Sequence, residues 1–124
     1  MTHPQSDNCR FCLENKLLID EPLLELERFY LLGSIDPVLP HQVIIVPFRH
    51  VETPFEMNAD EWRDLGGALT AAKTLLEPAG PNGFNIGWNV GAVAGQEVFH
   101  AHLHVIARFE GEAHSGIGIH GLFR

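Results

Sequence analysis

Apolar residues recur with the period of a helix in one stretch of the chain, between Asn58 and Gly80. Asn58 is a suitable N-cap, and Glu61 three residues later completes a capping box. Pro78 and Gly80 end the pattern, because proline and glycine interrupt a helix. One face, spaced by three and four residues, collects Trp62, Leu65, Leu69, Ala72 and Leu76. We therefore predict one long amphipathic helix here.

Six short stretches on either side of that helix have the composition of β-strands. They are rich in apolar, often β-branched or aromatic, residues, and prolines, glycines and acidic residues punctuate the chain between several of them. The predicted strands are residues 16–19, 23–26, 28–33, 42–47, 84–89 and 99–107. Strands, one long helix and then more strands indicate a small α+β domain with a mostly antiparallel sheet.

The composition narrows the class of protein. The chain has 124 residues, enough for a single domain, and its 45% hydrophobic and 19% charged residues are typical of a globular protein. A net charge of −8 argues against a dedicated binder of nucleic acid, which would need clustered Lys and Arg. The sequence has no run of eighteen apolar residues and no secretory signal at its start. We expect a cytoplasmic protein with no nucleic-acid or membrane partner.

Three of the eight histidines alternate along the last predicted strand, at His100, His102 and His104. Since the side chains of a strand alternate between two faces, the three imidazoles share one face, and the apolar residues between them share the other. Neutral imidazoles serve as metal ligands, proton carriers or nucleophiles near pH 7. Three positions on one straight strand are nearly collinear and converge poorly on a single ion. We therefore favour attack by His102, with its neighbours orienting it.

Two weaker patterns accompany the histidines. Cys9 and Cys12 form a Cys-x-x-Cys pair, which is typical of either zinc or redox chemistry, and a zinc site would need two more ligands from elsewhere. Glycines 83, 87, 91 and 95 recur every four residues among asparagines and a glutamine. We interpret this stretch as a strand that leads into a glycine-rich loop, whose backbone N–H groups are suited to hold a phosphate.

These motifs together resemble the histidine-triad (HIT) superfamily. Residues 100–106 match its His-φ-His-φ-His-φ-φ signature, where φ is apolar, at every position. Residues 89–96 resemble the family's Asn, glycine-rich loop and Ala-Gly-Gln, and residues 45–50 resemble its Val-Ile-Pro-basic-basic-His stretch, with Phe48 replacing one basic residue. The likeness runs from about residue 9 to 108, which makes residues 1–124 a single HIT-like domain with a C-terminal tail at 109–124.

The resemblance implies a fold and a function. The implied fold is a mostly antiparallel five-stranded sheet with one long helix and short helical segments, and the implied assembly is a homodimer. The function is hydrolysis or transfer at the α-phosphate of a purine nucleotide conjugate, such as a dinucleoside polyphosphate or a nucleoside phosphoramidate, without an organic cofactor. By this resemblance His102 is expected to form a nucleotidyl-histidine intermediate, with His104 and His100 as the other catalytic residues. The implied substrate contacts are Asn89, Gln96, Gly95, Ser34 and Asp36, and the implied structural zinc ligands are Cys9, Cys12, His50 and His100.

The sequence departs from the family pattern at three informative positions. Ser34 stands where an acid usually contacts the ribose, and His41-Gln42 replaces the usual Gly-His before the central strand. Glu97 stands where amidate-cleaving relatives tend to have serine. A third triad histidine favours the hydrolase-like branches over the uridylyltransferase branch. Two alternatives remain open at this point: a nucleotide-binding module without turnover, and a metallohydrolase that uses the three triad histidines as ligands.

Overall fold

The computed structural model describes residues 8–34, 36–37 and 39–123, so His3 and the rest of the N-terminal stretch lie outside the described residues. Its one long helix, α1 (Ala59–Leu76), begins as predicted: the Asn58 side chain accepts the N–H of Glu61, and the Glu61 carboxylate accepts the N–H of Asn58. A short 3-10 turn, Glu77–Ala79, and Gly80 in the left-handed region (φ 73°) end it. No helix among the described residues has the length and apolarity to span a membrane.

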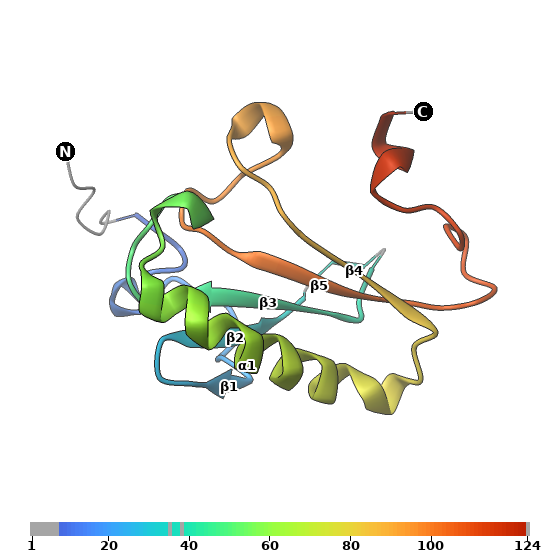
Figure 1. Ribbon diagram of the computed structural model, residues 1–124, viewed down its shortest axis with the longest axis horizontal. Coiled ribbons are helices and arrows are strands. Elements are labelled where there is room, and N and C mark those ends of the chain that lie inside the picture. The colour runs from blue at the N-terminus through green and yellow to red at the C-terminus, as the bar shows by residue number, and fades with distance from the viewer. Residues whose placement is uncertain (1–7, 35, 38, 124) are drawn as a thin grey trace.

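Five strands form one antiparallel sheet (Figure 1). In chain order they are β1 (Leu24–Glu25), β2 (Phe29–Gly33), β3 (Gln42–Pro47), β4 (Gly83–Trp88) and β5 (Leu103–Arg108), and in space they run β1-β2-β3-β5-β4. The predicted α+β class and antiparallel sheet are confirmed. The remaining elements are short 3-10 segments: Leu13–Asn15, Pro54–Glu56, Glu77–Ala79, Ala92–Ala94 and Ile119–Phe123.

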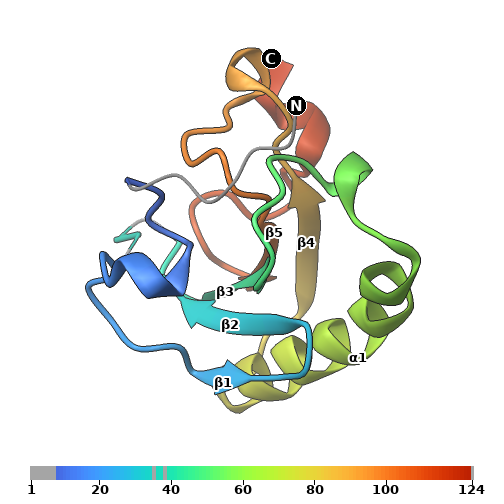
Figure 2. The same ribbon diagram turned by 90° about the vertical axis from the view of Figure 1, so that its left-hand side faces the viewer.

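The sheet separates two hydrophobic layers. Figure 2 shows α1 and the N-terminal segment on opposite sides of the strands. The larger layer packs against α1 and includes Leu31, Ile45, Leu103 and Val105. The smaller layer lies on the opposite face and joins Tyr30, Leu32 and Val46 of the strands to the segment that carries Cys9, Phe11 and Cys12. The N-terminal segment therefore covers the face of the sheet that α1 leaves open.

Two predicted strands differ from the structure by more than one residue at an end. Residues 16–19 are not a strand, because Lys16 adopts a left-handed conformation (φ 55°) that ends the 3-10 turn at residues 13–15 and redirects the chain. The last strand begins at Leu103 and not at residue 99. In the register of β3 with β5, the position opposite Ala101 would be Pro47, which has no N–H to donate, and Ala101 donates to Val51 O instead.

One position on the predicted helix face is also corrected. Trp62 is 47% exposed, whereas Glu61 beside it is 2% exposed. The Glu61 carboxylate is satisfied by the Arg49 guanidinium at 2.7 Å as well as by the N-cap, which explains how an acid occupies the buried side of the first turn.

The C-terminal tail is held to the sheet by the last residue of β5. Arg108 is hydrogen-bonded to the side chains of Asn85 and Glu112 and to the backbone carbonyls of His114 and Ile117. Figure 1 shows the tail continuing beyond the end of β5, with the 3-10 turn Ile119–Phe123 near its end.

Candidate active site and metal centre

The triad lies at the start of β5, on the sheet face opposite α1. Ala101, Leu103 and Val105 belong to the core under the helix, so the alternation predicted from the sequence holds even though the first two histidines precede the strand. The rings of His102 and His104 lie side by side, with their centroids 5.0 Å apart. His100 is completely buried and turns toward the N-terminal segment.

His102 is held in one tautomer by the backbone. Its Nδ1 lies 2.8 Å from the carbonyl oxygen of His100, and because a carbonyl only accepts, Nδ1 carries the proton. The remaining nitrogen, Nε2, therefore has a free lone pair. Burial lowers the pKa of His102 below its usual value, against the opposing effect of the bond to His100. The ring of Phe11 packs edge-on at 4.9 Å. The result is a neutral, oriented imidazole of the kind that a nucleophile requires.

His104 is oriented by a side chain. Its Nδ1 lies 3.4 Å from Oε1 of Gln42, and its Nε2 is buried with no hydrogen-bond partner among the described residues. Burial, together with the neighbouring His102, lowers the pKa of His104 to about 4. At neutral pH this imidazole is uncharged.

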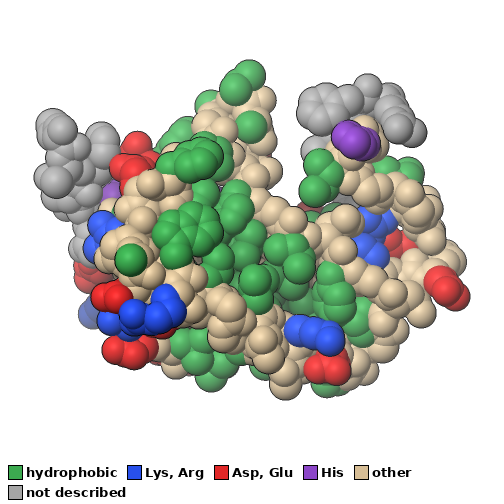
Figure 3. All heavy atoms as spheres, viewed as in Figure 1, with side chains coloured by type: hydrophobic (Ala, Val, Ile, Leu, Met, Phe, Trp, Pro, Cys, Tyr) green, Lys and Arg blue, Asp and Glu red, His purple; other side chains and the backbone are tan. Residues whose placement is uncertain are grey.

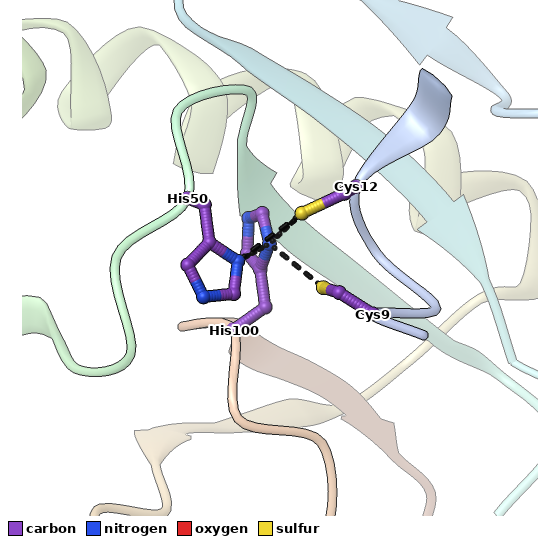
Figure 4. A group of neighbouring side chains, drawn as sticks. All are labelled: Cys9, Cys12, His50 and His100. Carbon is purple, nitrogen blue, oxygen red and sulfur yellow. Dashed lines mark hydrogen bonds between the residues drawn. The ribbon is translucent and has the colours of Figure 1, made fainter. Parts of the chain in front are cut away.

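The structure brings together all four predicted zinc ligands (Figure 4). One atom from each of Cys9, Cys12, His50 and His100 lies within 4.8 Å of the others. The Nδ1 atoms of the two histidines are 3.3 Å apart, and each lies 3.1 to 3.5 Å from a cysteine sulfur. Bonds of about 2.3 Å to sulfur and about 2.05 Å to nitrogen place tetrahedral ligands roughly 3.3 to 3.8 Å apart, so this donor set fits zinc.

The groups around this cluster also suit a closed structural site. His100 donates its Nε2–H to Pro47 O at 2.7 Å, which leaves Nδ1 as the ligand atom, and such second contacts fix the ligating tautomer. Burial raises the pKa of the Cys12 thiol to about 12, so a metal must displace its proton. His102 and His104 do not join the cluster, so the arrangement disfavours a metal held by all three triad histidines.

The glycine-rich segment forms a tight loop between β4 and the triad, as predicted. Gly91 and Gly95 have φ values of 87° and 94°, in the region that side chains rarely adopt, and they flank the 3-10 turn Ala92–Ala94. The Gln96 N–H donates to Gly91 O, and Gln96 Oε1 accepts the Gly91 N–H at 2.8 Å, so the loop is closed from both sides. Asn89 is exposed at the entrance to this loop, and its amide lies beside Gly95.

Gln96, a predicted phosphate contact, is 4% exposed. Its Nε2 donates to Glu52 O at 2.7 Å and to Val98 O at 3.2 Å. Both amide protons are therefore committed to backbone carbonyls. Together with its bond to the Gly91 N–H, these contacts make Gln96 a residue that shapes the loop.

The two remaining predicted contacts lie on the loop before β3. The Ser34 hydroxyl accepts the N–H of Asp36, and the Asp36 carboxylate accepts the N–H of Leu39. The Ser34 N–H donates to Gln42 O, which places this loop next to the residue that contacts His104.

Sequence reasoning missed two residues that contact the triad. Phe11, inside the Cys-x-x-Cys pair, packs its ring against both His100 and His102. Gln42 was noted only as a departure from the family pattern, and its contact with His104 depends on the register of β3 with β5, which the sequence does not supply.

The structure combines an α+β domain with a histidine triad, a glycine-rich loop and a Cys2His2 cluster. The HIT domain family model matches residues 19–111. An uncharacterised HIT-like protein of Methanocaldococcus jannaschii is 34% identical over 105 residues, which cover 84% of this chain and 81% of that protein. The chain belongs to the HIT family.

Solved structures and named enzymes agree with this assignment. A HIT family protein from Bacillus anthracis has a TM-score of 0.78 at 26% identity and covers 91% of this chain and 82% of its own. A HIT family hydrolase from Clostridium thermocellum has a TM-score of 0.70 at 30% identity, and the match covers 86% of this chain and 96% of that chain. The AP-4-A phosphorylase of Mycobacterium tuberculosis is 30% identical over 68% of this chain and 44% of that protein. The purine nucleoside phosphoramidase of Escherichia coli is 30% identical over 59% of this chain and 63% of that protein.

Proposed function

We propose that this protein is a nucleotide hydrolase or transferase that cleaves a purine nucleotide conjugate at its α-phosphate, with His102 as the nucleophile. The observation that carries the proposal is the bond from His102 Nδ1 to His100 O, which leaves Nε2 unprotonated and aligned in a buried ring. The AP-4-A phosphorylase and the purine nucleoside phosphoramidase among the relatives indicate the two substrate types to test.

The reaction proceeds in two displacements. In the first, His102 Nε2 forms a bond to the α-phosphorus, and the bond between phosphorus and the leaving group breaks. The leaving group departs with the electron pair of that bond and takes a proton from solvent. In the second, a water oxygen bonds to phosphorus, the P–Nε2 bond returns its electron pair to His102, and the proton of the water passes to solvent. Dividing one difficult displacement into two lowers the barrier of each.

The surrounding groups bind and orient the substrate. The glycine-rich loop, closed by Gln96 and joined by the exposed Asn89 amide, holds the phosphate oxygens where negative charge grows. The loop with Ser34 and Asp36 faces the ribose. A small neutral site of this kind binds a phosphate without a basic surface, in accord with the net charge of −8.

We propose that the Cys2His2 cluster holds a structural Zn²⁺ through Cys9, Cys12, His50 and His100. Bound there, the ion supplies a fixed crosslink and no reacting group, because four protein ligands leave no open position. The residue with two tasks is His100: its ring belongs to the cluster and its carbonyl orients His102. Reduced thiols in such a site are consistent with the cytoplasm as its location.

We also propose a homodimer formed through β4. This strand is an edge of the sheet, and Figure 3 shows hydrophobic side chains gathered on the face between α1 and β4. Ile86 of β4 and Leu75 of α1 are exposed. Light scattering should give twice the chain mass for the wild type and for Leu24→Lys on the opposite edge, and a monomer for Ile86→Lys. A monomeric wild type would contradict this proposal.

A panel of AMP conjugates tests the activity. Diadenosine polyphosphates and adenosine phosphoramidates should release AMP with the wild type and with His41→Ala, which alters an exposed histidine outside the triad. His102→Ala should lose at least about 10³-fold in kcat/KM, because the nucleophile is gone. Tight binding of these compounds without turnover would favour a nucleotide-binding module instead.

A further inference from the structure

Gln42 begins β3 beside the third triad histidine. In the register of the two strands, Ile44 lies opposite His104, so Gln42 is the diagonal neighbour of His104 on the same sheet face. The Gln42 side chain is almost fully buried, at 8% exposed. A buried amide is stable only when its donors and acceptor have partners, which restricts what this one can offer to His104.

The orientation of the Gln42 amide follows from its second contact. Its Nε2 lies 3.0 Å from Leu39 O, and a carbonyl oxygen can only accept, so the NH₂ end must face Leu39. The oxygen end, Oε1, therefore faces Nδ1 of His104 at 3.4 Å. An amide oxygen accepts only, so the proton between these two atoms belongs to His104 Nδ1.

The other nitrogen of His104 is then an acceptor. A neutral imidazole carries one proton, and with that proton on Nδ1 the buried Nε2 presents a bare lone pair. Nε2 has no partner among the described residues, which is costly for a buried polar atom. The His104 ring adjoins the His102 ring, so this unsatisfied acceptor belongs to the site where the nucleotide is attacked.

We propose that Gln42 is a positioning residue that fixes the tautomer of His104, so that His104 Nε2 accepts a hydrogen bond from a substrate or water O–H or N–H beside His102. In the mechanism this proposal rests on, the donor that suits it is the water that resolves the nucleotidyl-His102 intermediate. Accepting one hydrogen of that water directs its oxygen toward phosphorus. Gln42 thus acts on the second displacement and leaves nucleotide binding to the loops.

The test combines a spectroscopic readout with kinetics on three proteins. Two-bond ¹H–¹⁵N spectra of the zinc-loaded, ¹⁵N-histidine-labelled protein at pH 7 report which nitrogen of each ring is protonated, and His104→Gln assigns the signals. The wild type should show His104 protonated at Nδ1. Gln42→Met has a similar length and no acceptor, and it should shift His104 toward protonation at Nε2. Gln42→Glu keeps an acceptor and should restore the Nδ1–H form.

The kinetics should follow the tautomer. Gln42→Met should lower kcat by about tenfold or more, the size of effect expected for a displaced proton-handling group, with KM changed less than about threefold. The fraction of enzyme trapped as adduct should rise, because the second step is the one impaired, and Gln42→Glu should recover part of kcat. Thermal unfolding of each variant confirms that it is folded.

The outcomes separate this inference from the proposed function. Protonation of wild-type His104 at Nε2, or an unchanged tautomer in folded Gln42→Met, overturns the inference whatever the activity. Absence of turnover and adduct in the wild type overturns the proposed function, while the spectra still decide whether Gln42 sets the tautomer. A higher KM with an unchanged kcat for Gln42→Met would contradict a role in the second displacement.

Discussion

The Gln96 amide gives the sharpest quantitative prediction, because each of its polar atoms has an identified partner. Gln96→Leu keeps the approximate volume and removes three hydrogen bonds, to Gly91 N, Glu52 O and Val98 O. At a net value of about 1 kcal/mol each, their loss lowers the free energy of unfolding by about 3 kcal/mol. For a domain of this size, that corresponds to a fall in Tm of roughly 10 °C.

Gln96→Leu should lower kcat/KM more than a distant substitution that lowers the free energy of unfolding by the same amount. Without the two-sided closure between Gly91 and Gln96, the loop loses the backbone geometry proposed to hold the phosphate, and kcat/KM should fall by at least about tenfold. Gln96→Glu is the matched variant: it keeps the acceptor for Gly91 N–H and loses only the two donated bonds. It should be intermediate in loop function.

Urea unfolding at 25 °C and initial rates on an adenosine phosphoramidate measure the two effects on the same samples. A folded Gln96→Leu protein with wild-type stability and wild-type kcat/KM would refute the reasoning. Loss of stability with no loss of kcat/KM would show that the loop does not hold the substrate.

Three further predictions concern the proposed zinc site, the charge state of the triad and the packing around His102. His50→Asn should abolish stoichiometric zinc by elemental analysis and lower Tm, whereas His41→Asn should retain both. Burial lowers the pKa of His104 to about 4, so between pH 6.5 and 4 the unfolded chain takes up a proton that the folded chain does not, and stability falls with pH. Chemical unfolding should show the wild type losing up to about 3 kcal/mol more than His104→Gln over that range. Phe11→Leu removes the ring packed on His102 and should lower kcat several-fold with little change in zinc content.

The hydrophobic pattern predicted most of the fold, for physical reasons that particular elements make clear. The helix was found because its cap and its period lie in consecutive residues, and β3 was found because a β-branched run is typical of a buried strand. The start of β5 was not found, because it depends on Pro47, which is far away in sequence and cannot pair with Ala101. Local pattern carries no information about which residue will lie opposite.

The candidate site shows the same division. The spacing of the triad and of the Cys-x-x-Cys pair, read through the family resemblance, was enough to predict the four side chains that converge in the cluster. The hydrogen-bond partners of Gln96 and Gln42 were not predictable from the sequence. Both side chains donate to backbone carbonyls, Glu52 O and Leu39 O, that only the folded chain brings near. Residue type indicated polarity at these positions, and the fold determined the partners.

The proposed covalent intermediate on His102 is the central claim, and trapping it is the most direct measurement. The zinc-loaded protein would be mixed with an adenosine phosphoramidate or a diadenosine polyphosphate labelled at the α-phosphate, quenched under alkaline denaturing conditions and mapped by peptide mass spectrometry. The account predicts an adenylyl group on His102 that forms and decays at rates compatible with turnover, and no adduct in His102→Ala. Full turnover with no adduct on His102, or with an adduct on another residue, would contradict it.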